Sequence, residues 1–302
     1  MTRADPVLQT QLPNLRLSLS NRPENVAIVR EAIAGLGEAV LLDDDSLYDI
    51  KAAVTEACNN VVLHAYAGKE GPLGVELYAP ASGIEAVVRD RGRGIPPPVR
   101  SGDESGPGIG LRMIRALVRE VEFNGGAAAK VGEESDGRQP EDRADGQGTE
   151  VRMTFAAAGS RRLEPCRDDE FELPAAGSGE LASTFAMTLA PARLAHTVLP
   201  GLLGLLAARA EFSSDRISDT QRIAHVLAGC VRDSSDGGQL SIGVTVQPRD
   251  LELRIEPLRT VSEKELAADF GVDGQGPDAA QLTKVEPAPN PDTLVLRLAD
   301  QP

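Results

Sequence analysis

The chain of 302 residues contains no tryptophan, only three tyrosines and six phenylalanines, and three cysteines, Cys58, Cys166 and Cys230. An odd number of cysteines without C-x-x-C spacing argues against both a disulfide framework and a zinc site. With so few aromatic side chains, the core must be built from leucine, valine, isoleucine and alanine. The sequence also lacks an apolar run of 18 residues and an N-terminal hydrophobic segment, so we expect a soluble, cytoplasmic protein without a membrane partner.

Basic residues are scarce as well. Thirty-one Lys and Arg stand against 46 Asp and Glu, which gives a formal net charge of −15. A chain this acidic is repelled by phosphate backbones, and direct nucleic-acid binding through a basic face is therefore not expected. The length favours two domains of about 150 residues each. The 30 glycines and 21 prolines indicate a folded body with long irregular stretches.

The first half shows a clear order of periodic patterns. Alternating leucines predict a strand at residues 15–19, and helical spacing predicts a helix over residues 26–40. Asp43 to Asp45 offer an N-cap to a second helix, whose apolar positions recur at intervals of three and four up to Val61. Further patterns complete the half: strands at residues 74–79 and 84–90, a helix at 111–118 and a strand at 150–155. The predicted fold class is α+β, a two-layer sandwich with helices on one face of a mostly antiparallel sheet.

The second half repeats this order. A strand at residues 185–189 is followed by helices at 191–210 and 215–232 and by strands at 240–246, 251–255 and 294–298. Residues 185–212 align with residues 15–42 without a gap, and Ile223 then aligns with Ile50. The repeated order indicates an internal duplication.

The domain boundaries follow from composition. We predict a first domain over residues 12–156, with a disordered insert at about 125–147, a linker at 157–183 and a second domain at 184–300. Residues 124–150 carry seven acidic and three basic side chains, and residues 159–180 carry six and three. Such segments have too few large apolar side chains to fold by themselves.

Three polar elements of the first half are candidates for chemistry. The first is the helix face formed by Glu56, Asn60 and His64, which recur every four residues beside the apolar stripe. On this helix alone a solvated face is favoured over a pocket lining. The other two elements are the glycine-rich segments that begin at Asp90 and at Gly106, and each of these, taken alone, is also explained as an ordinary turn or a flexible loop.

The other two elements are rich in glycine. Asp90 ends a strand and opens the pattern Asp90-x-Gly92-x-Gly94, which lets the backbone pass close to a flat ligand. The pattern Gly106-x-Gly108-x-Gly110 leads directly into a helix, whose N-terminal N–H groups and positive dipole end suit a phosphate.

Taken together and in this order, the three elements resemble the nucleotide site of the GHKL ATPase superfamily, with its N, G1 and G2 boxes. The resemblance spans residues 12–156. Within the superfamily the chain is most similar to anti-sigma-factor serine kinases of the RsbW/SpoIIAB type, because these carry the string E-A-x-x-N-x-x-x-H-A-Y found from Glu56 to Tyr66. This implies the Bergerat fold of the superfamily.

The resemblance implies a role for each candidate residue. Glu56 would be the general base, Asn60 would hold Mg²⁺, and Asp90 would accept the adenine amino proton. The other positions would contact ATP through the backbone or water: Gly92, Gly94, Gly106, Gly108, Gly110 and Thr149. These parts match what phosphoryl transfer needs, a metal, backbone donors and a positioned base.

The implied cofactors are ATP and Mg²⁺, and the implied partners are a sigma factor and a STAS-type anti-sigma antagonist. One departure concerns an arginine that some family kinases carry before the G2 glycines, where this chain has Asp103-Glu104-Ser105. Arg100 or Arg112 would have to substitute. The alternative function is a nucleotide-dependent binding module without phosphotransfer.

The second half lacks the site residues. In the gapped alignment, Gly229 and Asp233 stand where Glu56 and Asn60 stand in the first half, and Pro257 follows the strand in place of a G1 box. We therefore predict a degenerate copy without a nucleotide, in which His225 belongs to helix packing. Because family kinases pair through their sheets, either a homodimer or an intramolecular pseudo-dimer is expected.

Overall fold

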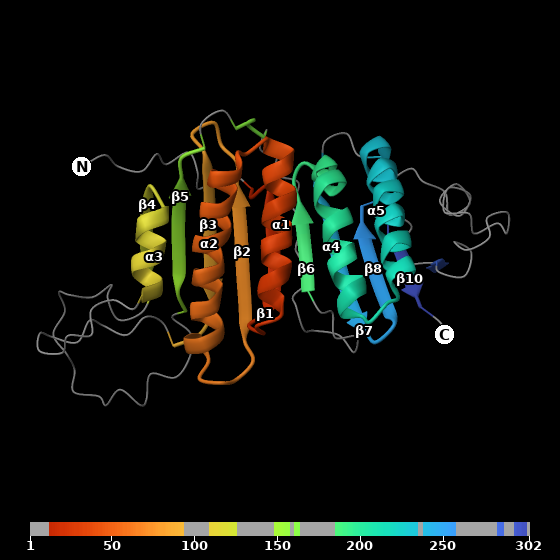
Figure 1. The fold of residues 1–302 in the computed structure, drawn as a ribbon, viewed down its shortest axis with the longest axis horizontal. Helices are drawn as coiled ribbons and strands as arrows, with labels where there is room; N and C mark the ends of the chain where they lie inside the picture. The colour runs from red at the N-terminus through yellow and green to blue at the C-terminus, as the bar shows by residue number, and fades with distance from the viewer. Residues whose placement is uncertain are drawn as a thin grey trace, which may run out of the picture.

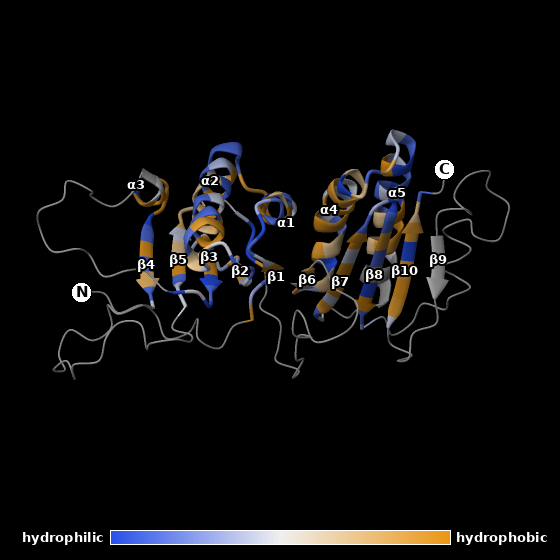
Figure 2. Ribbon diagram, turned by 90° about the horizontal axis from the view of Figure 1, so that it is seen from below, coloured by the Kyte–Doolittle hydropathy of each residue, from blue (hydrophilic) through white to orange (hydrophobic). Residues whose placement is uncertain are grey.

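The computed structural model describes residues 12–93, 109–125, 148–157, 160–163, 185–234, 238–257, 283–286 and 293–300. Within these ranges ten strands form one sheet in the order β4-β5-β3-β2-β1-β6-β7-β8-β10-β9. Every pairing in it is antiparallel. Figures 1 and 2 show that all the long helices lie on the same face of this sheet. The predicted α+β class with a mostly antiparallel sheet is confirmed.

The elements of the first half follow the predicted patterns closely. In chain order they are β1 (Leu15–Ser20), α1 (Asn25–Val40), α2 (Asp44–Asn60), the π-helical turn η2 (Val61–Ala65), β2 (Pro72–Tyr78), β3 (Ile84–Asp90), α3 (Ile109–Leu117), β4 (Glu120–Asn124) and β5 (Glu150–Phe155). The alternating leucines of β1 are buried beneath the helices. Asp43 caps α2 by accepting a hydrogen bond from the Ser46 N–H at 2.8 Å, which lowers the pKa of the Asp43 carboxyl.

Strand β4 was missed by the sequence reasoning. Within the described part of the chain it pairs only with β5, with Val121 opposite Met153 and Phe123 opposite Val151. None of its five side chains is fully buried. An edge strand of this kind carries a weak periodic signal, because only its two apolar residues mark the face that packs on the helices. The short alternation from Glu120 to Asn124 was the available signal.

The second half consists of β6 (Phe185–Leu189), the 3₁₀ turn η5 (Ala192–Leu194), α4 (Ala195–Arg209), α5 (Ser214–Ser234), β7 (Leu240–Gln247), β8 (Asp250–Glu256), β9 (Thr283–Glu286) and β10 (Leu294–Ala299). Strand β9 was missed as well. The spatial order β1-β2-β3-β5-β4 recurs as β6-β7-β8-β10-β9. Both halves therefore place the same sequence of elements in the same order outward from the centre of the sheet.

Burial corrects the alignment between α2 and α5. The buried positions of α2 are Ile50, Ala53, Val54, Ala57 and Cys58, and those of α5 are Thr220, Ile223, Ala224, Leu227 and Ala228. The two sets coincide at a constant shift of 170 positions, so the three-residue gap was wrong. Val226 and Cys230, rather than Gly229 and Asp233, occupy the positions of Glu56 and Asn60.

Two further predictions change at the edges of the halves. His225 of α5 is exposed, and its ring lies 5.9 Å from that of His196 on α4, so its helix contact is at the surface rather than in the core. Residues 160–163 lie within the predicted linker but pack on the first half. There the Arg161 N–H donates to the Val40 carbonyl at 2.7 Å, and Leu163 is buried. Apart from Gly125, the predicted insert at about 125–147 lies outside the described residues, as does most of the linker.

Candidate nucleotide site

Helix α2 carries the first two candidate side chains, Glu56 and Asn60, and both are partly exposed to solvent. The α-helix ends at Asn60 and is followed by the π-helical turn Val61–Ala65. A π turn holds an extra residue, so it breaks the four-residue repeat. His64 lies within this turn and is exposed to solvent, as a solvated face would be.

The π turn brings the end of this helical segment against the loop after β3. The Ala65 carbonyl accepts a hydrogen bond from the Arg93 N–H at 3.0 Å. A Cβ atom at Gly92 would lie 2.3 Å from that same carbonyl oxygen, which no side chain allows. Glycine at position 92 is therefore required by the contact between the N-box segment and the G1 loop.

Asp90 lies at the end of β3 with its backbone and one carboxylate oxygen engaged. Its N–H donates to the Thr149 carbonyl at 2.9 Å, and its Oδ1 accepts from the Gly92 N–H at 2.7 Å. Gly148 has a φ of +42°, and a Cβ there would lie 2.1 Å from the Asp90 carbonyl oxygen. These contacts hold Asp90, Gly92 and Thr149 together and leave Oδ2 of Asp90 for another donor.

An ion pair between Arg89 and Glu150, the residues next to Asp90 and Thr149, also holds the end of β3 to the start of β5. The Arg89 Nε donates to Glu150 Oε2 at 2.7 Å. Partial burial opposes ionisation of Glu150, but the hydrogen bond and positive charge of Arg89 outweigh it and lower the pKa of Glu150. The carboxylate thus stays charged, and β3 and β5 remain aligned beside Asp90 and Thr149.

Tyr66 is a site residue whose role the sequence reasoning missed. Its phenol oxygen accepts a hydrogen bond from the Arg91 N–H at 2.8 Å and donates to the Pro72 carbonyl at 2.5 Å. Burial raises the pKa of Tyr66, and the charge of Asp90 raises it further, so the phenol keeps its proton. In the sequence, Tyr66 was noticeable only as the last residue of the family string. Its hydrogen-bond partner, the Arg91 N–H, comes close to it only in the folded chain.

Glu56 faces the beginning of helix α3. A Cβ atom at Gly110 would lie 1.8 Å from Glu56 Oε1, so the carboxylate rests directly against the second residue of this helix. The free N–H groups and dipole of a helix N-terminus favour a negative group at this point. Glu56 and Gly110, predicted from separate motifs, are therefore in contact.

The remaining candidates are less constrained. Gly94, Gly106, Gly108 and Arg100 lie outside the described residues, and Arg112 is exposed on α3. Across the described ranges, no three His, Cys, Asp or Glu side chains cluster closely enough to hold a metal ion. Burial raises the pKa of Cys58 to about 12, so this α2 thiol stays protonated inside the core.

Comparison with known proteins places this site in a family. Residues 19–131 match the family model for the histidine kinase-like ATPase domain. The serine-protein kinase RsbW of Bacillus licheniformis is 34% identical over 113 residues, which cover 33% of this chain and 71% of that protein. The chain belongs to the RsbW family of GHKL proteins.

A second RsbW protein agrees with this assignment. The serine-protein kinase RsbW of Bacillus pumilus is 29% identical over 133 residues, 39% of this chain and 82% of that protein. A solved histidine kinase domain from Erythrobacter litoralis EL346 is 21% identical and covers 38% of this chain and 46% of its own, with a TM-score of 0.26. The RsbW likeness thus accounts for a segment about the size of the first half.

Two close approaches within the candidate site leave no room for a larger residue as the chain stands: a Cβ at Gly92 would meet the Ala65 backbone, and a Cβ at Gly110 would meet the Glu56 carboxylate. Among the described residues, the Asn60 amide has no hydrogen-bond partner and is free to act as a ligand. Within the same ranges, no helix has both the length and the apolar character needed to cross a bilayer.

Gly92→Ala is expected to weaken nucleotide binding and lower the melting temperature. The new Cβ would meet the Ala65 backbone, so either the π turn or the G1 loop must shift, at a cost of about 1–3 kcal/mol. We expect a drop in melting temperature of about 5 °C and at least about tenfold weaker ATP binding by calorimetry. Gly74→Ala is the control, because its Cβ would meet only Arg89 at 3.8 Å. Equal behaviour of the two variants would contradict the close contact.

Asn60→Ala is expected to weaken ATP binding about 10- to 100-fold in the presence of Mg²⁺, because it removes the proposed metal ligand. Binding of ATP with the metal chelated should change much less. Asn59→Ala, at the adjacent and similarly exposed position, serves as the control and should leave both affinities unchanged. If the ATP affinity of the variant falls equally with and without Mg²⁺, Asn60 contacts the nucleotide directly and not the metal.

Proposed function

We propose that this protein is a cytoplasmic, ATP-binding anti-sigma factor with Mg²⁺-dependent serine kinase activity. It holds a sigma factor inactive and phosphorylates a serine of a STAS-type antagonist. The observation that carries the proposal is the contact of Glu56 with the start of α3, in the segment related to RsbW. That contact puts a candidate base beside a helix N-terminus suited to the transferred phosphate.

The residues would divide the work as follows. Asp90 accepts the adenine amino proton through Oδ2, while Gly92 lets the loop lie flat beside the base. Asn60 and the phosphates would hold Mg²⁺, which when bound neutralises charge on the phosphates. The α3 N-terminus, beginning with Ile109 and Gly110, donates N–H groups to the terminal phosphate.

In the transfer itself, Glu56 takes the proton of the acceptor serine hydroxyl. The serine oxygen forms a bond to the γ-phosphorus as the bond from that phosphorus to the ADP oxygen breaks. The proton on Glu56 is later released to solvent. The contact of the Glu56 carboxylate with Gly110, near the start of α3, supports this role.

We propose domains at residues 12–156 and 184–300, joined by a linker at 157–183. Near its start, residues 160–163 of this linker pack on the first domain. The second domain would bind no nucleotide, because Val226, Cys230 and Pro257 stand where the first has Glu56, Asn60 and Asp90. Val226 offers neither a base nor a metal ligand, and a proline offers no carboxylate.

A second function, nucleotide-dependent binding without transfer, is favoured by Asp103-Glu104-Ser105 at the position of the family arginine. A transfer assay separates the two. The full chain is incubated with γ-labelled ATP, Mg²⁺ and a STAS-domain protein, and with the same protein carrying alanine at its acceptor serine. The kinase proposal expects label only on the first. Saturable ATP binding without label on any STAS protein would favour the alternative.

A further inference from the structure

The two halves meet at β1 and β6 in a register that is symmetric about one residue pair. Leu15 pairs with Leu189, Leu17 with Met187, and Leu19 with Phe185. Since equivalent residues of the segments β1–α2 and β6–α5 are 170 positions apart, Leu17 pairs with its own counterpart, and the other two pairs exchange when the halves are exchanged. This is the pattern of a two-fold, self-complementary interface between identical subunits.

The helices above this ladder have the same symmetry. Glu31 of α1 lies against its own counterpart, Gly201 of α4, where a Cβ would be 2.0 Å from Glu31 Oε1. Gly35 packs on Val198, the counterpart of Ile28, and a Cβ at Gly35 would be 2.6 Å from the Val198 Cα. The pseudo-two-fold axis therefore passes through both layers, at the pair Leu17–Met187 and at the pair Glu31–Gly201.

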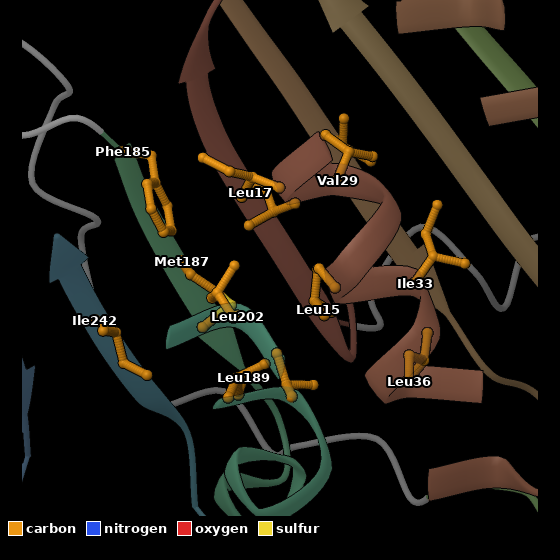
Figure 3. Close-up of a cluster of buried hydrophobic side chains, with 14 of the residues drawn as sticks. Leu15, Leu17, Val29, Ile33, Leu36, Phe185, Met187, Leu189, Leu202 and Ile242 are labelled. Carbon is orange, nitrogen blue, oxygen red and sulfur yellow. The ribbon is translucent and has the colours of Figure 1, made fainter. Parts of the chain in front are cut away.

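The interface between the halves is a core rather than a surface contact. Figure 3 shows Leu15 and Leu17 of β1 beside Phe185, Met187 and Leu189 of β6, with side chains of α1 and Leu202 of α4 above them. These five strand residues are at most 2% exposed. They belong to one hydrophobic cluster that runs through both halves without a break.

Polar groups at the junction are also satisfied across it. Asn14 is buried, and its Nδ2 donates to the Ala190 carbonyl at 2.8 Å while its Oδ1 accepts from the Ala79 N–H at 2.7 Å. One side chain thus ties the ends of β6 and β2 together. An unpaired β1 would expose backbone groups and buried leucines, which invites another strand to pair with it.

We propose that residues 185–299 are a built-in partner subunit, which occupies the β1–α1 surface of the first half and keeps the chain a monomer with one nucleotide site. The occupant of this surface is the chain's own β6 and α4, and a second copy has no free edge there. The partner-subunit part of this inference rests on the symmetric contacts and is independent of kinase activity, whereas the single nucleotide site rests on the ATP binding proposed for the first half.

Two glycine substitutions in the full chain test the interface. Gly35→Ala places a Cβ against the α4 backbone, which cannot yield without separating the helices, whereas Gly201→Ala meets only the flexible end of Glu31. Both variants replace a glycine within a helix by alanine, which is the better helix former. The effects on helix propensity and on the entropy of the unfolded chain are therefore similar in the two variants. We expect the melting temperature to fall by about 5 °C in G35A and to stay level or rise in G201A. Equal shifts in the two variants would overturn the contact.

Light scattering and calorimetry on the unmodified chain test the monomeric state and the single nucleotide site. The mass should remain that of one chain, 31.8 kDa, from about 1 to 100 μM, and ATP with Mg²⁺ should saturate at one nucleotide per chain. A reversible dimer in this range would mean that the surface still recruits a second copy, and two nucleotides per chain would mean that the second half has kept a site. Either result overturns the proposal. A G35A chain that begins to self-associate would support it, because β1 is then exposed.

Discussion

Replacing Asp90 by asparagine is expected to abolish ATP binding, with the dissociation constant raised at least about 100-fold. Oδ1 of Asp90 is already engaged by the Gly92 N–H at 2.7 Å, so Oδ2 is the acceptor left for the adenine amino group. In the variant that position holds an amide NH₂, and two donors would face each other. Calorimetry with ATP and Mg²⁺ measures the loss.

The matched control is Asp45→Asn, which makes the same chemical change at an exposed position in the first turn of α2. It should bind ATP like the unmodified chain. The melting temperature of the Asp90 variant should stay close to that of the control, because the asparagine oxygen can keep the Gly92 hydrogen bond. Unchanged ATP affinity in the Asp90 variant would remove this residue from the site.

Glu56→Gln is expected to leave ATP binding intact and to reduce phosphate transfer to the antagonist by about 10²- to 10⁴-fold, the usual contribution of a general base. Glutamine has the shape of glutamate, so it can still rest against Gly110 at the start of α3. It cannot take the proton of the serine hydroxyl. The measurement is single-turnover transfer from labelled ATP, with nucleotide affinity determined in parallel.

Glu38→Gln makes the same substitution at an exposed position of α1 and should change neither quantity. If the Glu56 variant loses binding and transfer equally, Glu56 supports the site without acting as the base. A variant with full transfer activity would exclude the base role outright.

The built-in subunit explains why the second half can lack the site residues and yet retain the fold. The interface depends on β6 and α4, whereas the site equivalents Val226 and Cys230 lie on α5. Neither position belongs to the β1–β6 ladder, and neither is among the nearest neighbours of Gly35 or Gly201. One half thus provides the candidate site and the other provides the surface that completes the sheet.

Local periodicity was enough to predict most elements of this protein. The alternating leucines of β1, the capped stripe of α2 and the strands β2 and β3 are each recognisable within a few residues, because their side chains alternate between a buried and an exposed environment. The three sequence motifs of the candidate site were also recognisable, because the residues of each motif lie close together in the sequence. The edge strands β4 and β9 were missed. The pairing of β4 shows why, because it touches one neighbour and buries little.

Tertiary structure alone decided how these pieces meet. The π turn at Val61–Ala65 brings Ala65 to Gly92, and no local pattern distinguishes it from one more helical turn. The register of α5 became clear only from burial, because two helices of similar apolar content align almost equally well with or without a gap. The pairing of Leu17 with Met187 joins residues far apart in the chain. Such a contact depends on the complementary shape of two finished surfaces, which the spacing within either segment does not encode.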